Sequence, residues 1–252
     1  MKKMVTPYKG SESSKKEQVT KMFDGISKQY DLLNRVISLG IDQSWRRKVV
    51  RLAGENKPQR IIDIATGTGD LAIALKTTAA EEIIGLDISP GMLSVGAEKV
   101  KKLALDHQIS MVLGDGEKLP YPDNYFDVAT VAFGVRNFEN LEQGLTEIFR
   151  VLRSKGSLLV LETAVPTRFP FKQGYKIYSG WVVPLMGRIF SRDQDAYQLA
   201  LAVAHQVLSG YDMIDVTKGA LWYHATYVKP YWAKEKLYTV KHEDHIFYTE
   251  RK

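Results

Sequence analysis

The chain has 252 residues, enough for one large α/β domain or for one domain with a smaller appendage. Its composition, 44% hydrophobic and 25% charged, is ordinary for a soluble globular protein. Its formal net charge of +6 is spread among acids, so charge alone does not select a nucleic acid, a membrane surface or an acidic substrate. The absence of cysteine excludes disulfides, iron–sulfur clusters, thiolate zinc sites and any cysteine nucleophile.

The N-terminal region has no apolar run of signal-peptide or membrane-spanning length, so we expect a cytoplasmic protein, with peripheral membrane contact left open. Residues 1–14 are rich in polar residues and are predicted to be disordered. From Lys15 to Leu33, apolar residues recur at spacings of three and four, which predicts an amphipathic helix. A second helix is predicted to start with Asp42 as its N-cap. Residues 15–57 would then form a helical cap.

Short apolar strands alternate with helices between residues 58 and 165. The strands are predicted at Arg60–Ala65, Glu82–Ile88, Ile109–Leu113, Phe126–Ala132 and Ser157–Thr163. The helices are predicted at Asp70–Lys76, after the Ser89-Pro90 pair, and at Leu141–Leu152. This alternation predicts a doubly wound α/β fold, in which helices cover both faces of a parallel sheet.

The pattern changes after Thr163. Phe171–Phe190 is aromatic and apolar but contains Gly180 and Pro184. It is interpreted as a helix that lines an apolar pocket, rests on a membrane or belongs to the core. Residues 191–209 are predicted to form another helix. The core with its substrate-pocket helices would therefore span residues 58–198, followed by an atypical tail, 199–252, whose last residues (Tyr238–Lys241 and His245–Thr249) suggest a hairpin.

The first predicted strand ends in a glycine-rich turn, RIIDIATGTG (Arg60–Gly69). Gly67 and Gly69 carry no Cβ, so the backbone can turn tightly and approach a ligand closely. The N–H groups that open the next helix can hold an anionic group. The pattern Gly67-x-Gly69-x-x-Ala72 alone does not separate a nicotinamide dinucleotide from S-adenosylmethionine.

Acids in or after the first three strands favour S-adenosylmethionine. Asp63 would repel a pyrophosphate, but it can meet the loop or, through water, the ammonium of a methionine moiety. Asp87 ends the second strand, where it can accept both ribose hydroxyls. Asp115 can accept from the adenine amino group while the N–H of Gly116 meets a ring nitrogen. These positions, in this order, predict S-adenosylmethionine as the cofactor.

A nucleic-acid substrate is disfavoured by the segment after the fourth strand. Enzymes that methylate nucleic-acid amino groups usually carry an Asn or Asp-Pro-Pro-aromatic segment there, whereas this chain has AFGVRN (Ala132–Asn137). Methylation of pyrimidine C5 needs a cysteine, and the chain has none. We therefore expect a smaller methyl acceptor.

Six segments closely resemble the quinone C-methyltransferases of menaquinone and ubiquinone biosynthesis, over residues 15–197: YDLLNRVISLGIDQSW (Tyr30–Trp45), DIATGTGD (Asp63–Asp70), GLDIS, FGVRNF, RVLRSKGSLLVLETA and FKQGYKIYSGWVVPLMGRIF. The resemblance implies that the cofactor contacts include Thr68, Asp87, Asp115 and Gly116. It also implies a prenylated naphthoquinol substrate, with demethylmenaquinol methylated on a ring carbon to menaquinol. Methylation of another small lipid or quinone is the alternative.

Such chemistry requires a deprotonated ring hydroxyl, an in-line ring carbon and a dry site that stabilises the oxyanion. Arg136 is the candidate for stabilising the quinolate or polarising a water that takes the proton. Its structural alternative is to brace Asp127 or a helix end. Tyr30 and Asn34 are candidates for the substrate pocket, and the apolar 171–190 segment suits a prenyl tail.

The tail departs from the family pattern, since the expected Gly-Gly-x-x-Ala ending is missing. Its segments TKGALWYHATYVKPYWA (Thr217–Ala233) and HIFY (His245–Tyr248) resemble the C-terminal end of spore-cortex-lytic cell-wall hydrolases. A chimera with a cell-wall-binding tail and impaired methyl transfer is therefore an alternative. The hairpin would either supply the last two strands of the sheet or leave its edge open. No metal is predicted, because four histidines of this region match no standard ligand spacing: His205, His224, His242 and His245.

Overall fold

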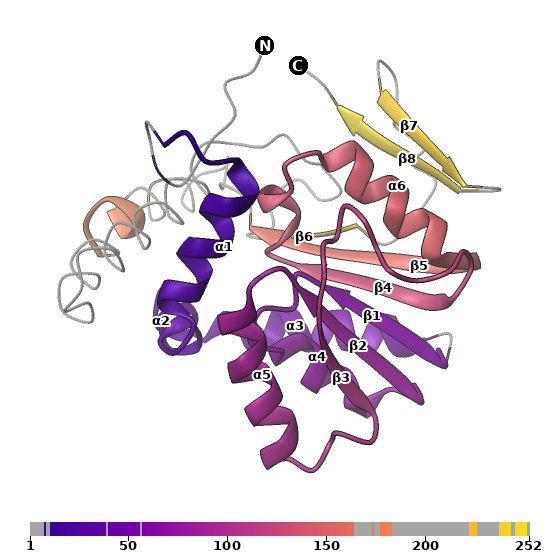
Figure 1. Cartoon of the computed structure of the whole chain (residues 1–252), viewed down its shortest axis with the longest axis horizontal. Coiled ribbons are helices and arrows are strands. Elements are labelled where there is room, and N and C mark those ends of the chain that lie inside the picture. The colour runs from indigo at the N-terminus through magenta and orange to yellow at the C-terminus, as the bar shows by residue number, and fades with distance from the viewer. Residues whose placement is uncertain are drawn as a thin grey trace.

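The computed structural model describes residues 8, 11–38, 40–55, 57–163, 173, 177–182, 222–225, 237–242 and 245–250. Its centre is a six-stranded sheet in the order β3-β2-β1-β4-β5-β6 (Figure 1). The strands are β1 (Arg60–Ile64), β2 (Glu82–Asp87), β3 (Ile109–Leu113), β4 (Phe126–Ala132), β5 (Leu152–Thr163) and β6 (Trp222–Ala225). All neighbours from β3 to β5 are parallel, and β6 is antiparallel to β5.

Helices cover both faces of this sheet (Figure 1). One face packs against α3 (Ile41–Gly54), α4 (Asp70–Ala74) and α5 (Pro90–Lys102), and the other against α6 (Leu141–Val151). Because successive side chains of a strand point to opposite faces, Ile61 joins the first core and Ile62 the second. Both residues are fully buried, which explains the continuous apolar runs of the strands. The predicted doubly wound α/β fold is confirmed.

The predicted helix starts after the second and fourth strands are also confirmed. The Ser89 hydroxyl accepts a hydrogen bond from the N–H of Met92 (3.2 Å), and Pro90 occupies the first turn of α5. The Asn140 side chain accepts from the N–H of Gln143 (3.1 Å) at the start of α6. Local capping chemistry therefore fixes where both helices begin.

The helical cap differs from its prediction, because the first amphipathic run is two helices. α1 (Lys15–Ile26) and α2 (Tyr30–Ile37) are separated at residues 27–29. The Ser27 hydroxyl donates to the carbonyl oxygen of Asp24 (3.1 Å), and the N–H of Gln29 donates to that of Ile26 (2.9 Å). This turn keeps the apolar spacing while it redirects the chain, so periodicity alone could not reveal the break.

Asp42 is not the N-cap of the next helix. α3 begins at Ile41 after Gly40, which adopts the left-handed conformation (φ 77°). Asp42 lies buried inside the first turn, where it accepts from the Ser38 hydroxyl (2.7 Å) and pairs with Arg46. A carboxylate in the first turn still suits the helix dipole, which is why its sequence signal resembled a cap.

The boundaries of α4 and β5 also differ from their predictions. α4 stops at Ala74 and continues as a short 3₁₀ turn, η1 (Leu75–Thr77). β5 begins at Leu152 rather than at Ser157, because Leu152 already pairs with Phe126 before an irregularity in the register.

The described parts of the C-terminal region confirm a hairpin but not its place in the sheet. β7 (Leu237–His242) and β8 (His245–Glu250) pair only with each other, and β7 contacts α6. The short strand β6 lies beside β5 instead, so the hairpin does not supply the last strands of the main sheet.

Most of the apolar 171–190 segment and the predicted helix 191–209 lie outside the described residues. Within the first segment, Tyr178–Val182 forms a π-helical turn in which Trp181 is 79% exposed. In the described part of the chain, no helix combines the length and apolarity needed to cross a membrane.

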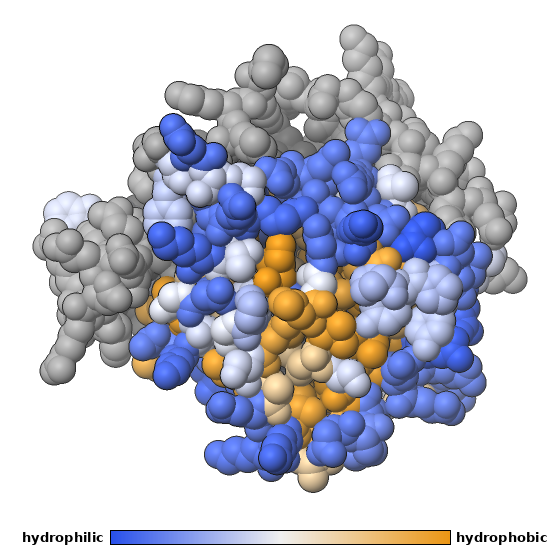
Figure 2. All heavy atoms as spheres, in the orientation of Figure 1, coloured by the Kyte–Doolittle hydropathy of each residue, from blue (hydrophilic) through white to orange (hydrophobic). Residues whose placement is uncertain are grey.

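The other edge of the sheet, among the strands that the structure describes, is β3, which pairs with β2. Leu113 at its end is 60% exposed, and Leu103 just after α5 is 50% exposed. Figure 2 shows an apolar surface over β3 at the centre of this face.

Replacement of Phe126 by alanine should lower the free energy of unfolding by about 3–5 kcal/mol, because its ring is fully buried and packs edge-on against Tyr121 and Tyr125. Urea unfolding followed by circular dichroism measures this loss. Leu113→Ala is the matched control in an exposed strand position, and equal losses in both variants would contradict this assignment of the core.

Candidate active site at the carboxyl ends of the strands

One pocket lies where β1, β2 and β4 end, beside the loop after β3 and beneath α1. Five predicted site residues line it: Tyr30, Gly67, Asp87, Asp115 and Gly116. Five others are not among its described lining residues: Asn34, Asp63, Thr68, Gly69 and Arg136. The parallel sheet thus brings the predicted acids to one edge, although not every predicted residue faces the cavity.

The glycine-rich turn has the backbone conformation that its glycines predict. Gly67 (φ 59°) and Gly69 (φ 78°) are both left-handed, and Gly69 precedes the first residue of α4. A Cβ on Gly69 would lie 3.2 Å from the Met111 Cε, so that position is also tightly packed. The turn therefore requires glycine for conformation at both positions and for space at the second.

Asp87 connects β2 to this turn. Its Oδ2 accepts from the N–H of Gly67 (2.7 Å) and its Oδ1 from the N–H of Ser89 (2.8 Å). Burial raises the pKa of the carboxyl, while these backbone hydrogen bonds act to lower it. The carboxylate also lines the pocket, where its remaining acceptor capacity is available to a ligand.

Asp63 lies beneath the turn rather than in the pocket. Only 1% exposed, it accepts hydrogen bonds from the hydroxyls of Thr66 and Thr130, both at 2.6 Å. Burial raises its pKa to about 6, although both hydrogen bonds act to lower it. Of the two predicted options, contact with the loop is the one that the structure contains.

Thr68 also acts away from the pocket. Its side chain is 1% exposed, and its hydroxyl donates to Asp31 of α2. Asp31 pairs in turn with Lys99 (2.5 Å), which also holds Asp70 (2.6 Å). Thr68 therefore ties the glycine turn to the helical cap.

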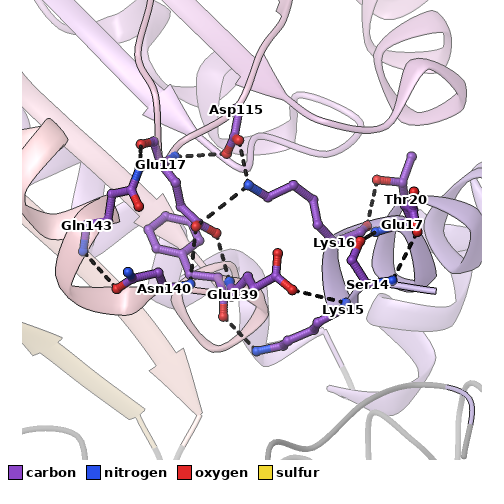
Figure 3. Close-up of polar contacts among 11 residues, drawn as sticks. Ser14, Lys15, Lys16, Glu17, Thr20, Asp115, Glu117, Glu139, Asn140 and Gln143 are labelled. Atoms are coloured by element: carbon purple, nitrogen blue, oxygen red, sulfur yellow. Dashed lines mark hydrogen bonds and ion pairs between the residues drawn. The ribbon is translucent and has the colours of Figure 1, made fainter. Parts of the chain in front are cut away.

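Asp115 and Gly116 form the wall after β3. The Asp115 Oδ1 accepts from the N–H of Glu117 (2.9 Å), and its Oδ2 pairs with the Lys16 ammonium (2.6 Å) (Figure 3). A Cβ on Gly116 would lie 2.8 Å from the Ile64 Cγ2, so only glycine fits without displacement. Lys16 was not predicted. Its one sequence signal is a positive charge in the first turn of a helix, where the dipole disfavours it.

The three residues predicted for the acceptor side are neighbours. Burial raises the pKa of the Tyr30 hydroxyl, while a hydrogen bond with the Asn34 side chain and the charge of Arg136 act to lower it. Arg136 follows β4 in the short turn η2 (Val135–Asn137).

Asp127 lies at the opposite end of β4 from Arg136. Its carboxylate pairs with Arg153 (2.6 Å) and accepts from the backbone N–H groups of Gln59 and Arg60 (both 2.8 Å). Some five residues of extended strand separate it from the η2 turn, roughly 16 Å. Arg153, and not Arg136, therefore forms the ion pair that braces Asp127.

Sequence reasoning missed a strained backbone and an unpaired amide oxygen at the pocket. Ala65 (φ 54°) and Phe133 (φ 58°) line it in the left-handed region, which costs about 1–3 kcal/mol per non-glycine residue. The Asn137 Oδ1 is buried and has no hydrogen-bond partner in the described part of the chain. Asn137 also lines the pocket, so a polar acceptor there is available to a ligand. Local sequence carries no signal for either feature.

Residues 11–223 match the ubiE/COQ5 methyltransferase family. The chain belongs to this family. It is 50% identical to the demethylmenaquinone methyltransferase of Bacteroides fragilis over 194 residues, which are 77% of this chain and 79% of that protein. It is 44% identical to the ubiquinone/menaquinone biosynthesis C-methyltransferase UbiE of a Geobacter species over 188 residues, 74% of this chain and 80% of that one. The enzyme is thus an S-adenosylmethionine-dependent methyltransferase.

Solved structures support the fold assignment. A putative S-adenosyl-L-methionine-dependent methyltransferase from Methanococcus maripaludis superposes with a TM-score of 0.55 at 21% identity, covering 80% of this chain and 91% of that one. The [4+2]-cyclase SpnF superposes with a TM-score of 0.57 at 20% identity, covering 77% and 90%. The family match extends past residue 198, where the methyltransferase core of this enzyme was predicted to end.

Replacement of Asp63 by asparagine should remove a pH dependence of stability. The folded-state pKa is raised to about 6, so the unfolded carboxyl ionises first as pH rises and the wild-type enzyme loses stability between about pH 4 and 6. The loss should reach roughly 3 kcal/mol relative to Asp63→Asn. Urea unfolding of both proteins from pH 4 to 7 measures it, and a constant difference would contradict the shift.

Gly116→Ala should weaken binding of S-adenosylhomocysteine by about tenfold or more, because the added methyl group meets Ile64 and Phe138 at the pocket wall. Titration calorimetry measures the affinity. Gly54→Ala is the control, since a Cβ there meets only Thr78, at 3.7 Å. Unchanged affinity in Gly116→Ala would remove this position from the cofactor site.

Proposed function

We propose that this enzyme transfers the methyl group of S-adenosylmethionine to a ring carbon of demethylmenaquinol, giving menaquinol. The names of its relatives support this acceptor. The structural observation that carries the proposal is one pocket that gathers the predicted cofactor residues and a buried tyrosine. Asp87, Asp115 and Gly116 line it together with Tyr30, and the charge of Arg136 acts on the Tyr30 hydroxyl.

The cofactor would occupy the side formed by β1, β2 and β3. In this arrangement Asp87 accepts the ribose hydroxyls, and Asp115 with Gly116 meets the adenine edge. The left-handed turn at Gly67 and Gly69 lets the methionine end approach the backbone. Asp63 and Thr68 act indirectly, since the hydrogen bond of Asp63 with Thr66 holds the turn from below and that of Thr68 with Asp31 ties it to the cap.

The acceptor would lie on the side of Tyr30 and Arg136. Since burial raises the pKa of the Tyr30 hydroxyl, it stays protonated near neutral pH and serves as a hydrogen-bond donor rather than as the base. Arg136 stabilises the quinolate or polarises a water that removes the hydroxyl proton. The ring carbon would then take the methyl group as the S–C bond breaks, leaving S-adenosylhomocysteine. Loss of the ring proton would restore the aromatic ring as the quinolate, and return of a proton to its oxygen would give the quinol, so that one proton is released overall.

Arg136→Ala should lower methyl transfer by roughly 10²–10³-fold while S-adenosylhomocysteine affinity stays within about threefold, because the guanidinium acts on charge that develops in the acceptor. Radiolabelled methyl transfer and calorimetry measure the two quantities. Arg153→Ala is the matched control, an arginine paired at the far end of β4. Lost cofactor affinity with intact transfer would reject the catalytic role.

The acceptor itself is tested with a short-chain demethylmenaquinol analogue. We expect radiolabelled methyl incorporation into this analogue and little into simple phenols or sterols. Preference for another lipid would keep the methyltransferase assignment and reject the quinone. Flotation with anionic vesicles tests the related proposal that the enzyme contacts the membrane peripherally to reach a prenylated acceptor.

The resemblance of residues 199–252 to cell-wall hydrolases adds a binding hypothesis that is separable from methyl transfer. Sedimentation with purified peptidoglycan tests it on the full chain and on a chain without residues 199–252. Equal sedimentation of both proteins would reject a cell-wall-binding tail.

A further inference from the structure

Lys15, the first residue of α1, is only 4% exposed, which is rare for lysine. Its Nζ donates to the carbonyl oxygens of Arg136 (2.9 Å) and Phe138 (2.7 Å), and its backbone N–H donates to the Glu139 Oε1 (3.3 Å). Figure 3 shows Lys15 reaching toward this segment from the start of the helix. These contacts fasten α1 to the turn that carries Arg136.

The position of this charge has a local cost. The first turn of a helix is the positive end of its dipole, so a lysine there is disfavoured. Burial further lowers the pKa of Lys15, while the charges of Glu117 and Glu139 act to raise it. The two carbonyl oxygens accept hydrogen bonds from the ammonium and offset part of this cost. The first turn of α1 therefore gives no reason for a lysine at this position. The reason lies in the distant turn, whose carbonyl oxygens bind the ammonium.

The same ammonium holds the backbone on both sides of Asn137. The η2 turn closes through hydrogen bonds from the N–H of Asn137 to the Gly134 carbonyl (2.9 Å) and from the N–H of Phe138 to the Val135 carbonyl (3.2 Å). Lys15 adds the carbonyls of residues 136 and 138. With its flanking peptides fixed, Asn137 keeps its side chain at the pocket, where its Oδ1 has no partner among the described residues.

Lys16 contacts a different wall of the pocket. Its Nζ lies 2.6 Å from the Asp115 Oδ2 and 3.6 Å from the Glu117 Oε2 (Figure 3). Two adjacent lysines thus contact different walls: Lys15 holds the turn beside the acceptor, and Lys16 pairs with the acid proposed for the adenine.

We propose that Lys15 is a positioning residue for methyl transfer. Its ammonium holds the turn from Arg136 to Phe138 so that Asn137 faces the pocket and Arg136 keeps its position beside Tyr30. The inference rests on the proposed function, because it assigns this turn to the acceptor side. Lys15 touches neither cofactor nor acceptor in this arrangement and acts through the backbone of the turn.

Steady-state kinetics with S-adenosylmethionine and the demethylmenaquinol analogue, run beside S-adenosylhomocysteine calorimetry, tests this role. We expect Lys15→Met to lower kcat by roughly 10- to 100-fold while cofactor affinity changes less than about threefold. Lys15→Arg, which keeps the charge and can donate to both carbonyls, should recover part of kcat. Lys16→Met should instead change cofactor affinity, and Lys21→Met, at an exposed position of the same helix, should change neither.

Hydrogen exchange by mass spectrometry gives a readout independent of activity. In Lys15→Met the amides of residues 134–140 should exchange faster than in the wild-type enzyme or in Lys21→Met. Unchanged exchange there would overturn the proposal whatever the acceptor. Equal loss of kcat and cofactor affinity, or no recovery in Lys15→Arg, would also overturn it. Absent methyl transfer in the wild-type enzyme with faster exchange in Lys15→Met would reject the proposed function and leave the anchoring of the turn intact.

Discussion

The buried carboxylate of Asp63 is the constraint on which the site depends. It accepts one hydrogen bond from the Thr66 hydroxyl in the glycine turn and one from the Thr130 hydroxyl in β4. A single side chain therefore joins the end of β1, the turn and the neighbouring strand. Because an unpaired buried carboxylate is costly, these three parts keep one arrangement. The strained Ala65 and the left-handed Gly67 lie at this junction. The turn then offers its N–H to Asp87, which places that acid at the pocket.

The helical cap is held to the sheet unevenly. α3 packs Val49 and Ala53 into one of the two large cores of the sheet, whereas the apolar contact of α1 with α5 is a small cluster of Met22, Ile26 and Met92. Ion pairs and hydrogen bonds add to these contacts, from Asp31 and Arg46 in the cap to the glycine turn and its helix, and from α1 to the loops after β3 and β4. Partly exposed ion pairs are weak singly, so α1 and α2 are less strongly held than α3 and the sheet. A site that must admit two substrates suits this combination of a firmly held sheet and less firmly held helices above the pocket.

Sequence reasoning succeeded where burial has a simple period. The strands Ile109–Leu113 and Phe126–Ala132 were predicted to the residue, and Ser89 with Pro90 located the start of α5. It failed where the chain changes direction without changing its apolar spacing, as between α1 and α2. It left open where the C-terminal hairpin pairs, since pairing with a distant strand leaves no local pattern to distinguish it from a separate sheet.

The sequence by itself determined the α/β class, the glycine turn and the order of Asp63, Asp87 and Asp115, because parallel strands all end at one edge and each acid lies near the end of its strand or just after it. Only the tertiary structure decided which of these groups face the cavity. Asp63 and Thr68 turn toward hydroxyl and carboxylate partners, and Lys15 reaches a turn more than a hundred residues away. Periodicity reports which face of an element is buried, but a hydrogen-bond partner across the fold depends on the packing of elements that no local pattern encodes.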